Sequence, residues 1–454
     1  MFPILDLLAF LMCALVWLGP FFYNLGHGRC RLLHPTGFFP LMVVYMLIPP
    51  LVFRWQGETM RLTSAMYDST WFLVEPMLIL AFSGIFYHLG VRLSKTSLVL
   101  GRQDEVAACL HLKASQGPTL FLFIITLAAI VLPAIFYHYL RSQSDYLSGY
   151  YWVHLLFSSY RILPVLVFQQ HISLGIIYLF MVLPLTVAYK SKGVFLFIVA
   201  AFLIFYQQKL WRKSKLLIVM LTVLVIMTPL AYYLYLERDV DDLQGLQKLG
   251  TDMTPSWEET FVAITHRDYA LESFACVIQE SKAEEKWHWG EKTLNDFLEN
   301  VPAFIYPNKP VALFTDFTAL YLPLDYRGYL IHFSRFFLSP FYLDFGLAGV
   351  ALAGLLIGTL YGFGYRFALR ATFRRQESWP VIMYLCLVIN AKYLVEANFF
   401  AALADTLGMS LPVFLVAWTA GLAGRRKPWV RTMEQSPANS DPSAAVPTRR
   451  IAGF

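Results

Sequence analysis

Arg327, His332 and Arg335 bring three potential cations together just before an apolar segment of the chain. On a helix, the three-residue spacing makes His332 a neighbour of Arg335 and leaves it partly facing Arg327. Arginine has forked N–H donors that match phosphate oxygens, so such a cluster at a membrane surface suits a diphosphate. Attraction to anionic lipid headgroups is the alternative. Lys309, in a proline-rich turn nearby, suits the same anion.

Two apolar segments contain charged residues. Arg161 lies in segment 152–168, which has no other charged residue. A guanidinium in lipid costs at least about 2.5 kcal/mol, so Arg161 should face a partner or a wet cavity, unless it snorkels to the interface. Lys392 and Glu396 lie four residues apart and so share one side of a helix. They either lock helices together as a neutral pair, or leave Glu396 as a base or an orienting carboxylate.

Arg267 and Asp268 open a predicted helix in a long, mostly polar segment, where a carboxylate also complements the helix dipole. The alternative is a helix cap with a surface ion pair. Asp239 and Asp241 have the Asp-x-Asp spacing of metal-dependent sugar-nucleotide transferases, but this triplet arises often by chance. The five cysteines match no metal motif, and no phosphate-cradling glycine loop is present. We therefore expect a site without a metal or a cofactor.

The composition indicates an integral membrane protein that must position these residues with helices. Of the 454 residues, 57% are apolar and only 15% are charged, whereas soluble domains are about a quarter charged. The apolar runs have the length of transmembrane helices, and the alternating segments of a membrane β-barrel are absent. We therefore expect an all-α polytopic protein, with a first span that is retained and not a signal peptide. Eleven helices are predicted, at 3–25, 37–53, 71–91, 118–140, 152–168, 172–189, 193–207, 216–236, 340–365, 379–397 and 405–423.

The distribution of lysine and arginine predicts the orientation. One set of connections, with the C-terminal tail, holds 20 basic residues, and the opposite set holds 5 apart from segment 237–335. Basic residues concentrate on the cytoplasmic side, so the N-terminus and segment 237–335 should lie outside and the C-terminus in the cytoplasm. Segment 237–335 nevertheless carries nine basic residues. Because outward loops normally avoid positive charge, this segment is where an anionic ligand is expected.

Four regions follow from this topology: 1–236 with eight spans, an outer loop at 237–339, 340–423 with three spans, and a tail at 424–454. The tail is rich in Pro, Ser and Ala, and we expect it to be disordered in the cytoplasm. The loop should be partly helical, over Trp257–Glu280 and Lys292–Val301, and its stretch Val311–Leu324 is apolar enough to lie on the membrane. Several glycines are expected to permit close helix packing, namely Gly346, Gly349, Gly354, Gly358, Gly362 and Gly364.

Several motifs follow one another in the second half of the chain. They are Arg267-Asp268, Val301–Pro310 with its Pro-x-Lys-Pro ending, Ser339-Pro340, Asp344–Gly349 with its Phe-Gly-x-x-Gly opening of a span, and the late Glu396. Their order resembles the Wzy-type oligosaccharide repeat-unit polymerases, including the branch that polymerises enterobacterial common antigen. The similarity covers roughly residues 185–400, and it rests mainly on the segment Val301–Pro310 and the Phe-Gly-x-x-Gly opening.

The resemblance implies a GT-C-like polymerase or ligase architecture in a bacterial inner membrane. It also implies a metal-independent hexosyltransferase that moves a growing chain from undecaprenyl diphosphate onto a new lipid-linked repeat unit in the periplasm. Membrane lipid, a Wzz-like chain-length regulator and a Wzx-like flippase would be partners, and nucleic acid would not. One departure is Lys190-Ser191-Lys192-Gly193, where members often have an arginine followed by a small residue, so the forked geometry is lost.

These residues can supply the two functions that the transfer requires. The charge that develops on the diphosphate must be stabilised, and the acceptor hydroxyl needs a base within hydrogen-bond reach. We expect the arginines to bind the diphosphate and His332 or Glu396 to be the base, with Arg267 and Asp268 at the reacting centre. The diphosphate would be held by Arg267, Arg327, Arg335 and Lys309, with Lys192 or Arg161 beneath it, and sugars would stack on Trp287, Trp289, Tyr306 and Tyr326.

Three other functions are considered. A ligase that moves finished polymer onto a lipid acceptor would share the donor, the fold and the charged outer loop. A flippase or transporter would distribute charged residues through the spans, whereas this chain gathers them at the predicted outer face. An acyltransferase is disfavoured because no His-Asp pair lies on a suitable span.

Overall fold

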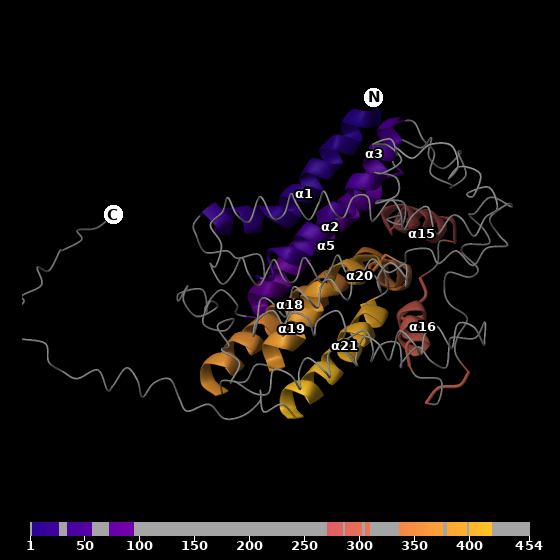
Figure 1. Cartoon of the computed structure of the whole chain (residues 1–454). Helices are drawn as coiled ribbons and strands as arrows, with labels where there is room; N and C mark the ends of the chain where they lie inside the picture. The colour runs from indigo at the N-terminus through magenta and orange to yellow at the C-terminus, as the bar shows by residue number, and fades with distance from the viewer. Residues whose placement is uncertain are drawn as a thin grey trace, which may run out of the picture.

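The computed structural model describes the chain in several stretches. They are residues 2–26, 34–56, 72–94, 270–284, 287–301, 305–308, 336–375, 379–396 and 399–419. All regular secondary structure in these stretches is helical (Figure 1). Three helical segments are long and apolar enough to cross a membrane: Ile4–Asn24, Val74–Leu93 and Ser339–Ala368. The chain is therefore an all-helical membrane protein in the part that the structure describes.

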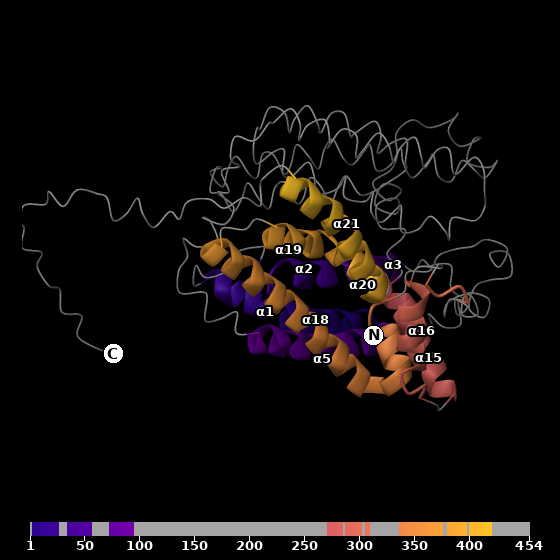
Figure 2. The same ribbon diagram turned by 90° about the horizontal axis from the view of Figure 1, so that it is seen from below.

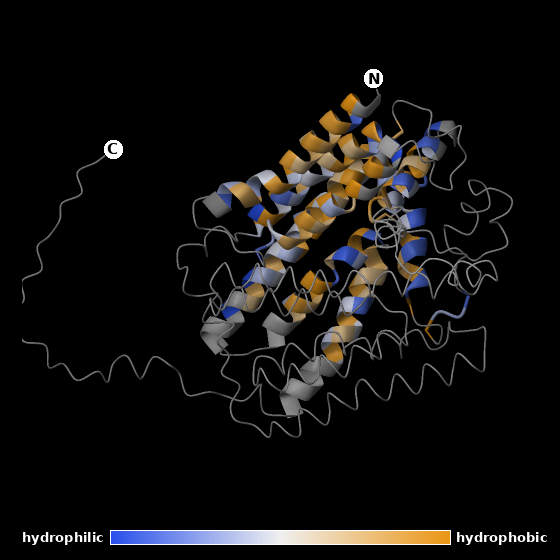
Figure 3. Ribbon diagram, turned by 45° about the horizontal axis from the view of Figure 1, so that its top comes forward, coloured by the Kyte–Doolittle hydropathy of each residue, from blue (hydrophilic) through white to orange (hydrophobic). Residues whose placement is uncertain are grey.

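The three long helices follow the hydropathy of the sequence. They are α1 (Phe2–Gly26), α5 (Val74–Leu93) and α18 (Ser339–Arg375), which match the segments predicted at 3–25, 71–91 and 340–365. Figure 3 shows predominantly hydrophobic residues along α1, which begins at the labelled N-terminus. The five spans predicted between residues 118 and 236 lie outside the described residues, as do the whole predicted tail and the segment 311–324.

Two predicted spans are interrupted. The segment predicted at 37–53 forms α2 (Phe38–Tyr45) and α3 (Ile48–Gln56), with a turn between them. The segment predicted at 379–397 forms α19 (Trp379–Ile389) and α20 (Ala391–Glu396), separated by a turn at Asn390. The last helix, α21 (Phe399–Thr419), begins earlier than the predicted residue 405.

Glycines bring α5 and α18 into close contact. A Cβ added at Gly354 or Gly358 of α18 would overlap the backbone carbonyl oxygen of Ser83 or Tyr87 on α5. The predicted role of these glycines in helix packing is confirmed at these two positions. Small residues allow backbones to approach in this way in membrane bundles. The α5–α18 pair therefore forms the centre of the described bundle.

Aromatic residues fill the core around this pair. Trp17 of α1 donates from Nε1 to the carbonyl oxygen of Leu80 at 3.0 Å, and its ring contacts that of Tyr87 with centroids 5.2 Å apart. The Tyr361 hydroxyl donates to the carbonyl oxygen of Leu387 on α19 at 3.0 Å. Each polar tip of these buried residues thus has a partner, as aromatic residues in a dry interior require.

Two shorter helices lie at one end of the bundle, α15 (Ala270–Glu284) and α16 (Glu291–Glu299). Figures 1 and 2 show both helices near α3, α20 and the beginning of α18, and we call this the α15/α16 end. The apolar side chains predicted to form one face of α15, among them Leu271 and Phe274, are buried. Lys282 of α15 forms an ion pair with Glu75 of α5 at 2.6 Å. α15 and α16 are therefore packed on the bundle and not separate from it.

Candidate functional site

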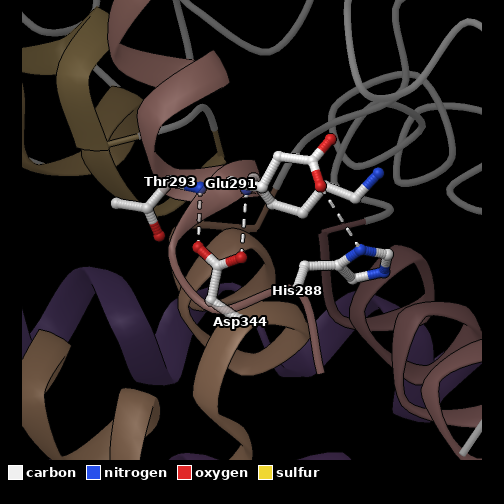
Figure 4. A network of polar contacts seen from close by, with 5 residues as sticks. His288, Glu291, Thr293 and Asp344 are labelled. Atoms are coloured by element: carbon white, nitrogen blue, oxygen red, sulfur yellow. Dashed lines mark hydrogen bonds and ion pairs between the residues drawn. The ribbon is translucent and has the colours of Figure 1, made fainter. Parts of the chain in front are cut away.

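A buried carboxylate on α18 caps the start of α16. Gly290, the residue before the helix, has φ 96° and provides no side-chain cap. Instead the backbone N–H groups of Lys292 and Thr293 donate to Oδ1 and Oδ2 of Asp344, at 3.0 and 2.7 Å (Figure 4). Asp344 is fully buried. The two amides are among those that a helix start leaves unpaired, and a negative group there also complements the helix dipole.

Backbone contacts extend this joint before α16. The N–H of His288 donates to the carbonyl oxygen of Leu343 at 3.2 Å, and that of Trp289 donates to the carbonyl oxygen of Asp344 at 3.3 Å. Two sets of hydrogen bonds, one to the Asp344 side chain and one between backbone groups, thus connect the start of α16 to the second turn of α18. We call residues 287–301 the α16 platform.

Trp287 is braced against a kink in α18. The kink is at Gly346, which has φ 58° and ψ −137°. A Cβ at this glycine would lie 2.7 Å from the Trp287 ring. The same ring meets Tyr342 edge to face, with centroids 6.0 Å apart, and the side chain remains 41% exposed. Trp287 therefore has a structural contact on one side and an open surface on the other.

Trp289 is far more open. Its side chain is 79% exposed, and its φ of 52° is unusual for a residue other than glycine. Its ring has an edge contact with Phe345, with centroids 6.5 Å apart. Left-handed backbone at a large residue is held only where the surroundings determine it, and such strain gathers at binding sites. The bond from its N–H to Asp344 is part of what determines it here.

Glu396 forms an ion pair at the same end of the bundle. Its Oε1 lies 2.9 Å from Nζ of Lys392, one turn earlier on α20. The shared side predicted from the four-residue spacing is therefore present. The side chains of Lys392 and Glu396 are 21% and 24% exposed, so neither is sealed in the interior. A carboxylate in this position can be held by lysine and still be reached from outside.

Phenylalanines connect the α16 platform to the helix that follows Glu396. Phe297 of α16 meets Phe400 of α21 edge to face, with centroids 5.2 Å apart. Phe400 contacts Phe399 in the same way at 5.2 Å, and Phe399 contacts Phe341 of α18 at 6.4 Å. The platform, α18 and the start of α21 thus share one aromatic cluster. Its position brings the exposed tryptophans and Glu396 to one end of the molecule.

A buried polar ladder joins α19 to α21 deeper in the bundle. The Asn390 amide donates from Nδ2 to Oγ1 of Thr406 at 3.1 Å, and that hydroxyl donates to the carbonyl oxygen of Ala402 at 2.8 Å. Ser410 continues the ladder by donating to the carbonyl oxygen of Thr406. The ladder therefore connects the turn at Asn390 to α21 through side chains.

No family model, curated protein or solved structure matches this chain. Among the described residues, no three His, Cys, Asp or Glu side chains gather as a metal site would require.

The structure describes four of the predicted site residues. Trp287 and Trp289 lie on the α16 platform, Tyr306 is half-buried after it, and Glu396 ends α20. The remaining predicted residues lie outside the described residues: Arg161, Lys192, Arg267, Asp268, Lys309, Tyr326, Arg327, His332 and Arg335. The positioning role of Asp344 was not predicted, although an acidic residue directly before a Phe-Gly-x-x-Gly motif is a signal that could have drawn attention to it.

Proposed function

We propose that the chain is a polysaccharide polymerase of the bacterial inner membrane. It transfers an oligosaccharide chain from undecaprenyl diphosphate onto a new lipid-linked repeat unit, and the α15/α16 end faces the periplasm. The observation that supports this most is that the exposed tryptophans precede α16 and Glu396 ends α20, two helices that lie near each other at one end of the described bundle (Figure 2). The count of basic residues in the connections supports the orientation.

The proposed substrate has a lipid part and a sugar part, and together they require a site of this kind at the membrane surface. The polyprenyl chain stays in the bilayer, so the diphosphate and the sugars are presented at the membrane surface. Sugar rings expose C–H faces that pack on aromatic rings, and Trp287 and Trp289 offer open aromatic surface. The braced position of Trp287 against Gly346 fixes the direction of that surface. Rigid support of this kind lowers the cost of orienting a bound sugar.

The proposed reaction is a direct displacement at the anomeric carbon. A hydroxyl oxygen of the acceptor sugar forms a bond to that carbon, and the bond from the carbon to the phosphate oxygen breaks. The leaving undecaprenyl diphosphate takes the electron pair, and the hydroxyl proton passes to Glu396 or to His332. Lys392 holds the Glu396 carboxylate in place through the 2.9 Å contact. Arg267, Arg327 and Arg335 stabilise the charge on the leaving diphosphate.

The test is the glycan profile of cells that depend on this chain for polymer. Arg335→Ala should abolish polymer while single repeat units are still displayed, because the donor is made but not joined. Glu396→Gln should lower the amount of polymer by about 100-fold or more if Glu396 is the base. Glu75→Gln is the matched control, since Glu75 also forms an ion pair at this end, with Lys282. Full-length polymer from Arg335→Ala at normal expression would contradict the proposal.

A further inference from the structure

The α16 helix has its polar and apolar sides reversed relative to a helix that faces water. Leu294 and Phe297 are 55% and 47% exposed, whereas Asp296 is only 3% exposed. A helix on a soluble surface places its apolar side chains inward and its acidic ones outward. Exposed apolar groups at this density indicate a surface that meets something other than water.

The exposed apolar side chains continue onto a membrane-spanning helix. Trp289 contacts Phe345, and Leu347, two residues later on α18, is 52% exposed. Further along α18, Leu352, Leu356 and Phe363 are also exposed and lie within the candidate span Ser339–Ala368. In a transmembrane helix, such residues face the lipid. The exposed apolar residues of the α16 platform and of the candidate span thus approach each other at the Trp289–Phe345 contact.

The level of α16 along the bundle agrees with a position at the membrane surface. α18 kinks at Gly346, and α16 is attached directly before this kink through Asp344. From Leu347 to Ala368, at about 1.5 Å per residue, the helix is long enough to cross a hydrocarbon core of about 30 Å. A crossing that begins at Leu347, after the kink, places the attachment point at the membrane surface. Tryptophans gather at this level in membrane proteins, and Trp287 and Trp289 lie here.

We infer that α16 is an interfacial helix, which inserts Leu294 and Phe297 into the boundary between the headgroups and the acyl chains of one leaflet. The occupant of the exposed face is the phospholipid bilayer. The helix carries Glu291, Lys292 and Glu299, so it has no cationic excess, and its insertion depends on apolar burial and not on anionic lipid. The inference needs only that the chain lies in a membrane, and it does not depend on the proposed polymerase activity.

Insertion of α16 would fix the depth of the α16 platform relative to the membrane. The buried cap at Asp344 sets the start of α16 on α18, and the inserted side chains hold its outer face in the membrane. The platform is then supported from both sides. A group carried on a membrane-embedded lipid would reach Trp287 and Trp289 at a defined depth.

The test places an environment-sensitive NBD fluorophore at position 294. The probe is attached to Leu294→Cys in the full chain, with Cys30 and Cys109 replaced by serine, since Cys13, Cys276 and Cys386 are buried. The protein is reconstituted in phosphatidylcholine vesicles whose acyl chains are brominated or not, and iodide is added as a water-soluble quencher. Lys282→Cys, at an exposed position of the neighbouring helix α15, carries the probe as control.

Insertion predicts an about twofold or greater loss of emission at position 294 in brominated lipid, because an interfacial helix lies about 5–10 Å into the headgroup and acyl boundary. Iodide should have little effect there, and the control position should show the opposite pattern. Replacing part of the phosphatidylcholine with phosphatidylglycerol should not change the result. Quenching of position 294 by iodide would overturn the inference in favour of water. Protection from both quenchers would overturn it in favour of a cover made by protein, either another segment or a second copy of the chain.

Discussion

Phe297 on α16 meets Phe400 on α21 edge to face, with ring centroids 5.2 Å apart. This contact joins the α16 platform to the helix that follows Glu396, so the platform and the start of α21 form one packed unit. Asp344 fixes the other end of the platform to α18. The described part of the candidate site is thus held by packed helices, which favours precise positioning of a substrate.

Phe297→Ala should loosen this unit. Edge-to-face aromatic pairs contribute about 0.5–1.5 kcal/mol beyond the area they bury. We expect faster hydrogen exchange at the backbone amides of 291–299 and at the start of α21. Phe367→Ala is the control, because Phe367 lies on α18 away from this cluster and stacks on Phe363. Equal exchange in the two variants at 291–299 would show that the contact does not hold the platform.

Asp344→Ala should expose the start of α16. The change removes both acceptors from the Lys292 and Thr293 amides, and the loss of a helix cap costs about 0.5–2 kcal/mol. Hydrogen exchange at these two amides should accelerate by about tenfold if the cost is near 1.4 kcal/mol. Asp344→Asn keeps one acceptor oxygen. Its exchange rates at these two amides should lie between those of the unchanged protein and those of Asp344→Ala. Unchanged exchange in Asp344→Ala would contradict the capping role.

Gly346→Ala should displace the Trp287 ring from its packed position against α18. The position has φ 58°, and the added Cβ would lie 2.7 Å from the ring of Trp287. Strained backbone of this kind costs about 1–3 kcal/mol, and the ring must also shift. The apparent Tm in detergent should fall, and Trp287 should become more exposed. Gly19→Ala in α1 is the control, because nothing lies within 4 Å of its Cβ, and its Tm should not fall.

The stability of the chain should depend on pH through His34. This residue lies in the turn between α1 and α2, and burial lowers its pKa from 6.5 to about 4, with a smaller contribution in the same direction from His88. Its Nδ1 accepts the Thr36 backbone N–H at 3.2 Å, a bond that protonation of this nitrogen would remove. The unfolded chain binds this proton at a higher pH than the folded chain. Stability is therefore fully present above about pH 6.5 and is lost as the pH falls towards about 4.

The measurement for His34 is the difference in Tm between about pH 7.5 and about pH 5, where only the unfolded state gains the proton. His34→Asn is the control, since its Oδ1 can still accept the Thr36 N–H but does not titrate. The acid-induced fall in Tm should be smaller in the variant than in the unchanged protein. A fall of the same size in both would assign the pH dependence to other groups.

Hydropathy alone was sufficient to predict the three long apolar helices. α1, α5 and α18 each consist of a long apolar run, and the cost of unpaired backbone in lipid leaves a helix as the available structure. The platform helix was predicted at 292–301 and begins one residue earlier. Its leucines and phenylalanine have helical spacing, which is a local signal.

Contacts between distant residues were not predictable in this way. The side-chain partner of Asn390 is Thr406 of another helix, and the cap of α16 comes from Asp344, 52 residues beyond Lys292 in the sequence. The ion pair of Lys392 with Glu396 was predictable because both residues lie on one helix turn. The aromatic cluster that connects the platform to Glu396 required the arrangement of α16, α18 and α21 in space.

The most direct test of the proposed polymerase is reconstitution of the purified chain with its expected substrate. Vesicles would contain undecaprenyl-diphosphate-linked oligosaccharide and no lipid A core, and the products would be separated by glycan length. We predict a ladder of lipid-linked products that increase by one repeat unit, with release of undecaprenyl diphosphate. Substrate of unchanged length, with its reducing-end linkage intact, would contradict the proposal and favour a protein that only moves the lipid.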